Sequence, residues 1–92
     1  MTYRIRATAR FRKDYKQMRK RGLEMARLNE VIALLASGSQ LDEKYHDHAL
    51  SGNYEGHREC HITPDWLLAY YKEDDILVLT LSRTGTHSDL FG

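Results

Sequence analysis

Apolar and polar residues follow two different periods along this chain, and each period predicts a different kind of element. Near the N-terminus, Tyr3, Ile5 and Ala7 alternate with arginines. A period of two places every second side chain on the same face of an extended backbone. The alternation therefore predicts a first strand over about residues 2–7.

Two helices are predicted next. Thr8 is a suitable N-cap for the first helix, whose apolar residues recur at helical spacing over residues 11–18 and which Gly22 is placed to end. A second apolar stripe predicts a helix over about residues 24–36, which Gly38 can close. Because the connection between the two helices is short, we expect them to be antiparallel neighbours.

Residues 37–56 form the longest irregular stretch, and its length favours a functional loop. Strands are then predicted at residues 57–63, 66–72 and 76–82, and the short turns between them indicate an antiparallel meander. The order β-α-α-β-β-β predicts an α+β fold, in which the two helices cover one face of a small antiparallel sheet. We expect residues 1–92 to form a single domain.

The last predicted strand contains a conflict in its alternation. If Leu77, Leu79 and Leu81 face the helices, strict alternation sends Arg83 to the same face. We therefore expect the strand to end, or to bulge, before Arg83.

Charge is distributed unevenly along the chain. Residues 1–36 contain ten basic and three acidic residues, which gives +7, whereas residues 37–92 contain four basic and ten acidic residues, which gives −6. A dense basic segment suits a polyanion, and few acidic residues are interleaved to form pairs within a solvated helix face. The basic residues that we expect to bind substrate are Arg12, Lys13, Lys16 and Lys20.

Cysteine content and hydropathy limit the compartment and the class of protein. The single cysteine, Cys60, excludes an internal disulfide framework and a cysteine-based zinc cluster. No segment is long and apolar enough to span a membrane, and the N-terminus lacks the apolar region of a signal peptide. We expect a cytoplasmic protein that does not contact membranes.

The histidines raise the question of a metal site. His57 and His61 are four residues apart, and on the predicted strand they would lie about 13 Å apart, too far to share one ion. A site built from distant residues, such as His48, His61 and His87, stays open and would suit a zinc-dependent hydrolase. We expect no metal and no other cofactor.

Metal-free cleavage of RNA requires three groups. A base takes the proton of the ribose 2′-OH, an acid protonates the departing 5′-oxygen, and a cation stabilises the charge on the phosphate. Histidine suits both proton-transfer roles, arginine suits the phosphate, and a carboxylate such as Asp65 could orient an imidazole or take a proton itself. The other candidates are His48, His61, His87 and Arg83.

Each of these residues also has an ordinary structural explanation. Asp65 follows Pro64 and is a common turn residue, while Trp66 and Phe91 are typical of a hydrophobic core. On spacing alone, a non-catalytic module that binds RNA or the ribosome through its basic helices is the alternative to a nuclease.

Three motifs distinguish these alternatives. They are D-H-x-L-x-G at residues 47–52, R-x-x-H-x-x-P-D-W at residues 58–66, and R-T-G-T-H at residues 83–87, which is followed by L-F-G at the C-terminus. In this order they resemble the YafQ-like branch of the RelE superfamily of toxins, and the resemblance covers essentially the whole chain.

The resemblance implies a RelE-like fold and a ribosome-dependent endoribonuclease that cuts mRNA in the A site of the 70S ribosome. It also implies the toxin of a type II toxin–antitoxin system, held inactive by a small acidic antitoxin that binds DNA and is DinJ-like. The functional residues that it implies are His48, His61, Asp65, Trp66, Arg83, His87 and Phe91.

Roles within this set follow in part. His87 is the most natural general acid, and Phe91 would stack on or position a nucleotide. His48, His61 and Asp65 are candidates for the base and for contacts to phosphate or bases, and the sequence does not rank them. His46 and His57 lie outside the motifs and are expected to be surface residues.

Overall fold

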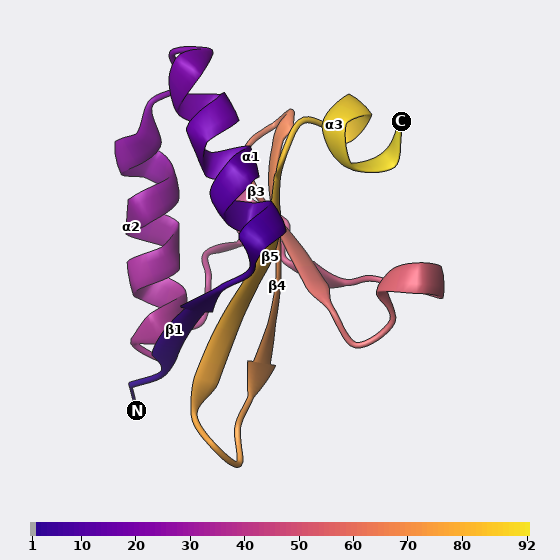
Figure 1. Cartoon of the computed structure of the whole chain (residues 1–92). Helices are drawn as coiled ribbons and strands as arrows, with labels where there is room; N and C mark the ends of the chain where they lie inside the picture. Colours follow the sequence, from indigo (N-terminus) through magenta and orange to yellow (C-terminus); the bar gives the residue numbers. More distant parts are fainter. Residues whose placement is uncertain (1) are drawn as a thin grey trace.

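Two helices pack against one face of a five-stranded sheet in the computed structural model, which describes residues 2–92 (Figure 1). The predicted α+β class is confirmed. None of the helices within these residues is long and apolar enough to cross a membrane. In chain order the elements are β1 (Arg4–Ala7), α1 (Ala9–Lys20), α2 (Met25–Ala36), the short 3-10 helix η1 (Glu43–Tyr45), β2 (His48–Ala49), a second 3-10 helix η2 (Gly52–Tyr54), β3 (Arg58–Thr63), β4 (Trp66–Glu73), β5 (Val78–Gly85) and α3 (His87–Phe91).

The strand order is β1-β5-β4-β3-β2. β3, β4 and β5 form the predicted antiparallel meander, but β1 pairs parallel with β5, with Arg4 opposite Val78. The sheet is therefore mixed, and the prediction of a wholly antiparallel sheet is wrong for β1. No tight turn joins β1 to its neighbour, so the connection leaves its direction open; a hairpin would enforce an antiparallel pair.

Both long helices follow the predicted signals. The side chain of Thr8 accepts a hydrogen bond from Phe11 N at 3.0 Å and caps α1. Gly22 and Gly38 each follow a helix with φ of +82°, a left-handed conformation that favours glycine. The apolar stripes that were predicted for the helices are buried against the sheet, at Phe11, Met18, Leu28, Val31, Ile32 and Leu35.

Alternation along the strands separates a core face from a second face, which we call the site face. Trp66, Leu68 and Tyr70 join the hydrophobic core under the helices. Because neighbouring residues of a strand point to opposite faces, Leu67 and Ala69 lie on the site face. Opposite Ala69 in the ladder are Glu59 and Arg83, and Glu59 is in turn opposite His48.

A bulge on β5 brings Arg83 to the site face. Ala69 is opposite Arg83 and Tyr70 is opposite Leu81, so Ser82 has no partner on β4. The extra residue shifts the alternation, and Arg83 points away from the face on which Leu81 packs. The predicted bulge is confirmed, and the strand continues beyond it to Gly85.

The C-terminal residues, which have the polar sequence of a flexible tail, instead form the short helix α3. Its N-cap Thr86 accepts a hydrogen bond from Asp89 N at 3.1 Å, and the Asp89 carboxylate accepts one from Thr86 N at 2.9 Å. This reciprocal capping box stabilises a helix too short to be recognised from apolar spacing.

Candidate functional site

Three of the predicted catalytic residues, His48, His61 and His87, gather on the site face. The ring of His61 lies at the centre of the group, with its centroid 6.0 Å from that of His48 and 5.8 Å from that of His87. β2, β3 and α3 each contribute one of these histidines. The structure thus brings together side chains that are separated by up to 39 positions in the sequence.

The three imidazole rings use the same nitrogen to contact the rest of the protein. In each ring Nδ1 lies beside an oxygen that can only accept a hydrogen bond, so Nδ1 carries a proton and donates it. The Nε2 atom of each ring is then the one available for other contacts. The acceptors are the His46 carbonyl for His48 at 2.7 Å, the Pro64 carbonyl for His61 at 3.3 Å, and Asp65 Oδ1 for His87 at 2.6 Å.

Glu59 is a member of this group that the sequence analysis missed. It is buried in the site face, and its Oε1 atom lies 3.4 Å from His48 Nε2 and 4.0 Å from His61 Nε2. We describe Glu59 and His48 as an imidazole–carboxylate pair. The sequence did contain a signal for Glu59. It is two residues from His61 on the same predicted strand, so the two side chains share a face.

The same residues have the donor atoms of a metal site. One ligand atom each from His48, Glu59 and His61 lie within 4.8 Å of one another. Imidazole nitrogens together with a carboxylate oxygen are typical ligands of zinc and other transition metals. His87, which was part of the alternative metal site considered from the sequence, is not in this group.

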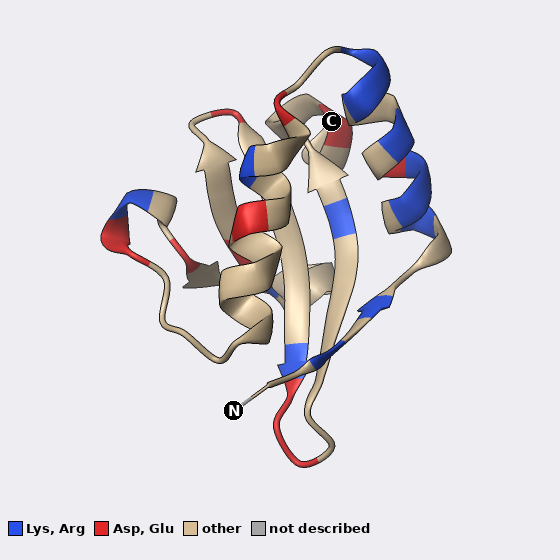
Figure 2. Cartoon of the chain, turned by 90° about the vertical axis from the view of Figure 1, so that its left-hand side faces the viewer, with Lys and Arg blue, Asp and Glu red and all other residues tan. Residues whose placement is uncertain are grey.

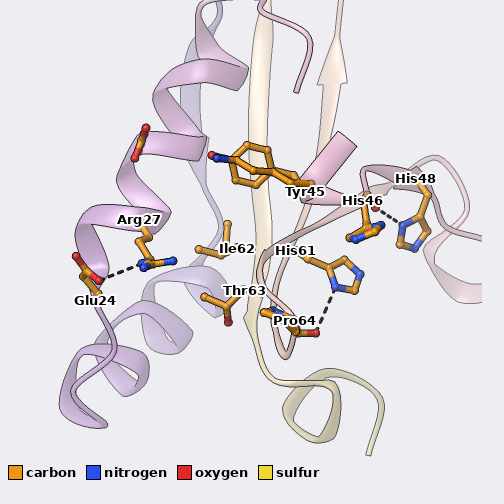
Figure 3. Close-up of a pocket in the computed structure, with 11 residues that line it drawn as sticks. Glu24, Arg27, Tyr45, His46, His48, His61, Ile62, Thr63 and Pro64 are labelled. Atoms are coloured by element: carbon orange, nitrogen blue, oxygen red, sulfur yellow. Dashed lines mark hydrogen bonds and ion pairs between the residues drawn. The ribbon is translucent and has the colours of Figure 1, made fainter. Parts of the chain in front are cut away.

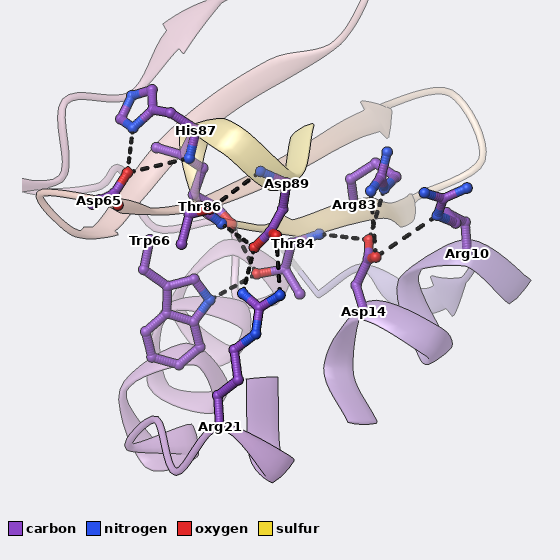
Figure 4. A network of polar contacts seen from close by, with 11 residues as sticks. Arg10, Asp14, Arg21, Asp65, Trp66, Arg83, Thr84, Thr86, His87 and Asp89 are labelled. Atoms are coloured by element: carbon purple, nitrogen blue, oxygen red, sulfur yellow. Dashed lines mark hydrogen bonds and ion pairs between the residues drawn. The ribbon is translucent and has the colours of Figure 1, made fainter. Parts of the chain in front are cut away.

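Asp65 lies against His87 and orients its ring. Its Oδ1 atom accepts hydrogen bonds from both the ring and the backbone N of His87, at 2.6 Å and 3.2 Å (Figure 4). The hydrogen bond from the His87 side chain, followed by that from its backbone, lowers the pKa of Asp65. Asp65 is therefore ionised at neutral pH and fixes which nitrogen of His87 faces the site.

Contacts around α3 hold His87 in place (Figure 4). Arg21, at the end of α1, binds the Asp89 carboxylate through two hydrogen bonds of 2.7 Å and 3.1 Å, and holds the pKa of Asp89 well below its usual range. A Cβ atom at Gly85 would lie 2.8 Å from Asp89 Cβ, closer than real contacts allow. The R-T-G-T-H motif thus combines close packing at Gly85, a helix cap at Thr86 and a functional imidazole at His87.

Arg83 is held by a carboxylate that the sequence analysis did not connect to it. Asp14 of α1 accepts a hydrogen bond of 2.7 Å from Arg83 Nε and one of 3.1 Å from Thr84 N (Figure 4). The hydrogen bond to Asp14 raises the pKa of Arg83, which remains a cation. Asp14 therefore fixes the guanidinium at the edge of β5.

A row of aromatic rings forms the other side of the site. Phe91 is about half exposed, and its ring centroid lies 5.9 Å from that of Tyr54. The row continues from Tyr54 to His57 at 5.9 Å and from His57 to Tyr71 at 4.8 Å. The expectation that His57 is a surface residue is wrong, because its ring is partly buried within this row. Phe91 is the member with a face available to a nucleotide.

Trp66, which we expected to contact substrate, is buried and does not lie on the site face. Only 3% of Trp66 is exposed, and its Nε1 donates a 3.0 Å hydrogen bond to Thr84 Oγ1 on the core side of the sheet. The reason is strand parity, since Trp66 shares a face with Leu68 and Tyr70. Its contribution is to support Thr84, the neighbour of Arg83.

Asp47 positions the loop that carries His46 and His48. Its carboxylate accepts a hydrogen bond of 2.7 Å from Tyr70 Oη, and Arg58 Nε lies 3.3 Å from its second oxygen. Burial, together with the bond to Asp47, raises the pKa of the Tyr70 phenol, which therefore keeps its proton. The D-H motif thus joins an anchor to a functional histidine.

The basic residues predicted to bind substrate lie apart from the histidines. Figure 2 shows lysines and arginines concentrated along α1 and β1. Within residues 2–92, five exposed basic side chains of α1 form no ion pair and present uncompensated charge; they are Arg12, Lys13, Lys16, Arg19 and Lys20. The four that were predicted to bind substrate are among them.

Comparison with known proteins gives consistent matches over nearly the whole chain. A family model for YafQ, a bacterial toxin of type II toxin–antitoxin systems, matches residues 3–92. The mRNA interferase toxin YafQ of Escherichia coli K12 is 38% identical over 89 residues, which cover 96% of this chain and 95% of the relative.

Solved structures agree with this match. The crystal structure of the E. coli DinJ–YafQ complex contains a chain that superposes with a TM-score of 0.90 at 37% identity, covering 98% of this chain and 99% of that chain. A metal-bound toxin from Helicobacter pylori superposes with a TM-score of 0.90 at 40% identity, covering 99% of this chain and 100% of the other.

Proposed function

The chain belongs to the YafQ family of bacterial toxins of type II toxin–antitoxin systems, and from this premise we propose that it is an endoribonuclease that cleaves mRNA on the ribosome. The observation that carries the proposal is the grouping of three imidazoles on the face of the sheet that also carries Arg83. Ala69 of β4 lies between Glu59 and Arg83 in the ladder, so the strands that carry His61 and Arg83 flank β4 on either side.

His61 is the base in the proposed reaction. With Nδ1–H donated to the Pro64 carbonyl, Nε2 has a lone pair that can take the proton of the ribose 2′-OH. His48 is less suited, because both of its nitrogens are engaged by oxygens. The resulting 2′-oxygen attacks the phosphorus and forms a bond to it, and the bond from phosphorus to the 5′-oxygen then breaks.

His87 is the acid that protonates the departing 5′-oxygen. Its Nδ1 is held by Asp65, which leaves Nε2 available to contact the leaving group. His48, paired with Glu59, and Arg83, fixed by Asp14, supply positive charge to the phosphate oxygens as charge develops on them. Phe91 stacks on or positions the nucleotide next to the acid.

A metal ion is the competing explanation for the histidine group. His48, Glu59 and His61 fit an ion such as Zn²⁺, and the H. pylori relative is described as metal-bound. A bound divalent ion would supply Lewis-acid catalysis or an activated water. The proposed reaction needs neither, because the 2′-OH is the nucleophile and the residues above provide the base, the acid and the cations.

We further propose that an antitoxin silences this protein. The E. coli relative has been crystallised with DinJ. The basic surface of α1 suits a small partner with an acidic arm, whose other end would bind DNA.

Induced expression in a bacterium tests the proposed function. We expect growth to stop and new mRNA 5′ ends to appear in translated regions, and we expect co-expression of the adjacent open reading frame to restore growth. Toxin that has been stripped of metal with EDTA and then dialysed free of the chelator should cut mRNA on programmed ribosomes as fast as untreated toxin. Growth arrest without new 5′ ends would indicate a non-catalytic ribosome-binding module. Loss of cleavage in the stripped toxin, with recovery on addition of Zn²⁺, would indicate a metal-dependent hydrolase.

Ribosome binding should depend on the basic face of α1. Simultaneous replacement of Arg12, Lys13, Lys16 and Lys20 by glutamine should weaken binding and reduce the slope of log affinity against log salt by roughly one for each phosphate that the protein no longer neutralises. The fold should survive, since all four side chains are exposed. An unchanged affinity across a salt titration would contradict the role of this face.

A further inference from the structure

A cavity of 840 Å³ lies beside the histidine group, between α2, η1 and the end of β3 (Figure 3). Its volume is in the range of small-ligand sites, which is about 300–1,000 Å³. β2 covers only the first residues of β3, so the sheet edge near His61 opens toward α2. None of the residues assigned to the reaction above, other than His48 and His61, lines this cavity.

The walls of the cavity combine apolar surface with hydrogen-bonding groups. Tyr45, Ile62 and Pro64 provide the apolar part. Arg27 of α2 and Glu24, the N-cap of α2, line the opposite wall and form an ion pair of 3.0 Å. A guanidinium and a carboxylate together offer donors and acceptors, which is the complement that the edge of a nucleobase requires.

His46 connects the cavity to the reaction centre. Its backbone adopts a left-handed conformation, with φ of 48°, which is uncommon for a residue other than glycine. This turn aims its carbonyl at His48 Nδ1, and it brings its ring to 5.5 Å from the ring of His61 (Figure 3). The His46 side chain is exposed, but it also forms part of the boundary between the cavity and the reaction centre.

The positions of the base and the acid determine in which direction the RNA runs through the site. An in-line displacement requires the base at the 2′-OH and the acid at the 5′-oxygen to lie on opposite sides of the phosphorus. His61 borders the cavity, whereas His87 lies beyond His61 and shares α3 with Phe91. The nucleotide that carries the attacking 2′-OH is thus on the cavity side of the site, and the departing nucleotide is on the Phe91 side.

We propose that this cavity binds the base of the nucleotide on the 5′ side of the cleaved phosphate, and that Tyr45 and Arg27 determine preference at that position. The proposal rests on the proposed ribonuclease function. An acidic peptide is a less suitable occupant than an uncharged base, because the carboxylates of Glu24 and Glu30 balance the cations Arg27 and Lys44 in the lining.

The test compares cleavage-site preferences on ribosomes programmed with an mRNA that is randomised at the nucleotides flanking the cut. Arg27→Ala and Tyr45→Leu should each reduce the preference at the 5′ nucleotide by about fivefold or more, which is the scale of a single hydrogen-bonded or stacked base. Preference at the 3′ nucleotide should not change. Arg4→Ala is the matched control, since it removes an equal charge from an exposed site on β1 and should alter neither preference.

The outcomes separate this proposal from the function on which it rests. If the wild-type protein cuts no RNA, the ribonuclease function is wrong. If it cuts with a 5′ preference that both variants retain, or if the variants change only the 3′ preference, the cavity is not the 5′ subsite. If the variants cut normally but lose affinity for the antitoxin, the cavity is a protein-docking site. Thermal unfolding of each variant checks that it is folded.

Discussion

Replacement of His87 by glutamine is expected to lower the cleavage rate on the order of a hundredfold or more and to leave ribosome binding unchanged. The physical reason is that glutamine cannot donate a proton to the departing 5′-oxygen, although it has a similar length. His87 lies at the first position of α3, outside the core, so the substitution should not affect folding.

A substrate with sulfur in place of the 5′-oxygen distinguishes acid catalysis from positioning. A thiolate leaves without protonation, so His87→Gln should lose far less activity on this substrate than on the normal one. If the variant loses the same factor on both, His87 positions the RNA and the acid must be sought at His48 or His61. Because His87 lowers the pKa of Asp65, that carboxylate stays ionised, and its titration should not appear in the neutral part of the pH profile.

The lengths and types of the main elements could be predicted from the sequence because they depend on local patterns. Helical spacing, caps at Thr8 and Gly22, and alternation along β3 to β5 are each contained within a few residues. The direction of β1 depends on its pairing with β5, which lies more than 70 positions away, and no turn signal specifies it. Likewise, α3 depends on a contact between Arg21 and Asp89 as well as on its own capping box.

The residues of the candidate site divide in the same way, into those that a local pattern reveals and those that depend on a distant partner. His48, His61 and His87 were found because their motifs resemble a family, and Arg83 was placed on the correct face because a break in alternation was visible. Glu59 and Asp14 were missed, since what makes each of them functional is a partner on another element. Trp66 was expected to contact substrate because it belongs to a motif. It is two residues from Leu68 on the same predicted strand, and this spacing places both side chains on the core face.

Replacement of His61 by glutamine should also lower the cleavage rate on the order of a hundredfold, and here the substrate with sulfur in place of the 5′-oxygen carries the test. The better leaving group does not replace the base, because the 2′-OH still has to lose its proton. His61→Gln should therefore keep most of its loss on this substrate, whereas His87→Gln should not. Single-turnover rates at saturating toxin on the two substrates, with the fold checked by thermal unfolding, give this comparison directly.

Glu59→Gln is the matched comparison, because the Glu59 carboxylate lies beside both His48 and His61 and could itself take a proton. The substitution removes this carboxylate and keeps the shape of the side chain. We expect it to lower the rate by roughly tenfold or more, since His48 loses the carboxylate that holds it near the phosphate. The loss should be smaller than that of His61→Gln on both substrates, because His61 still takes the proton from the 2′-OH. If Glu59→Gln instead loses the larger factor on both substrates and His61→Gln the smaller, Glu59 is the base, and His61 stabilises the charge on the phosphate.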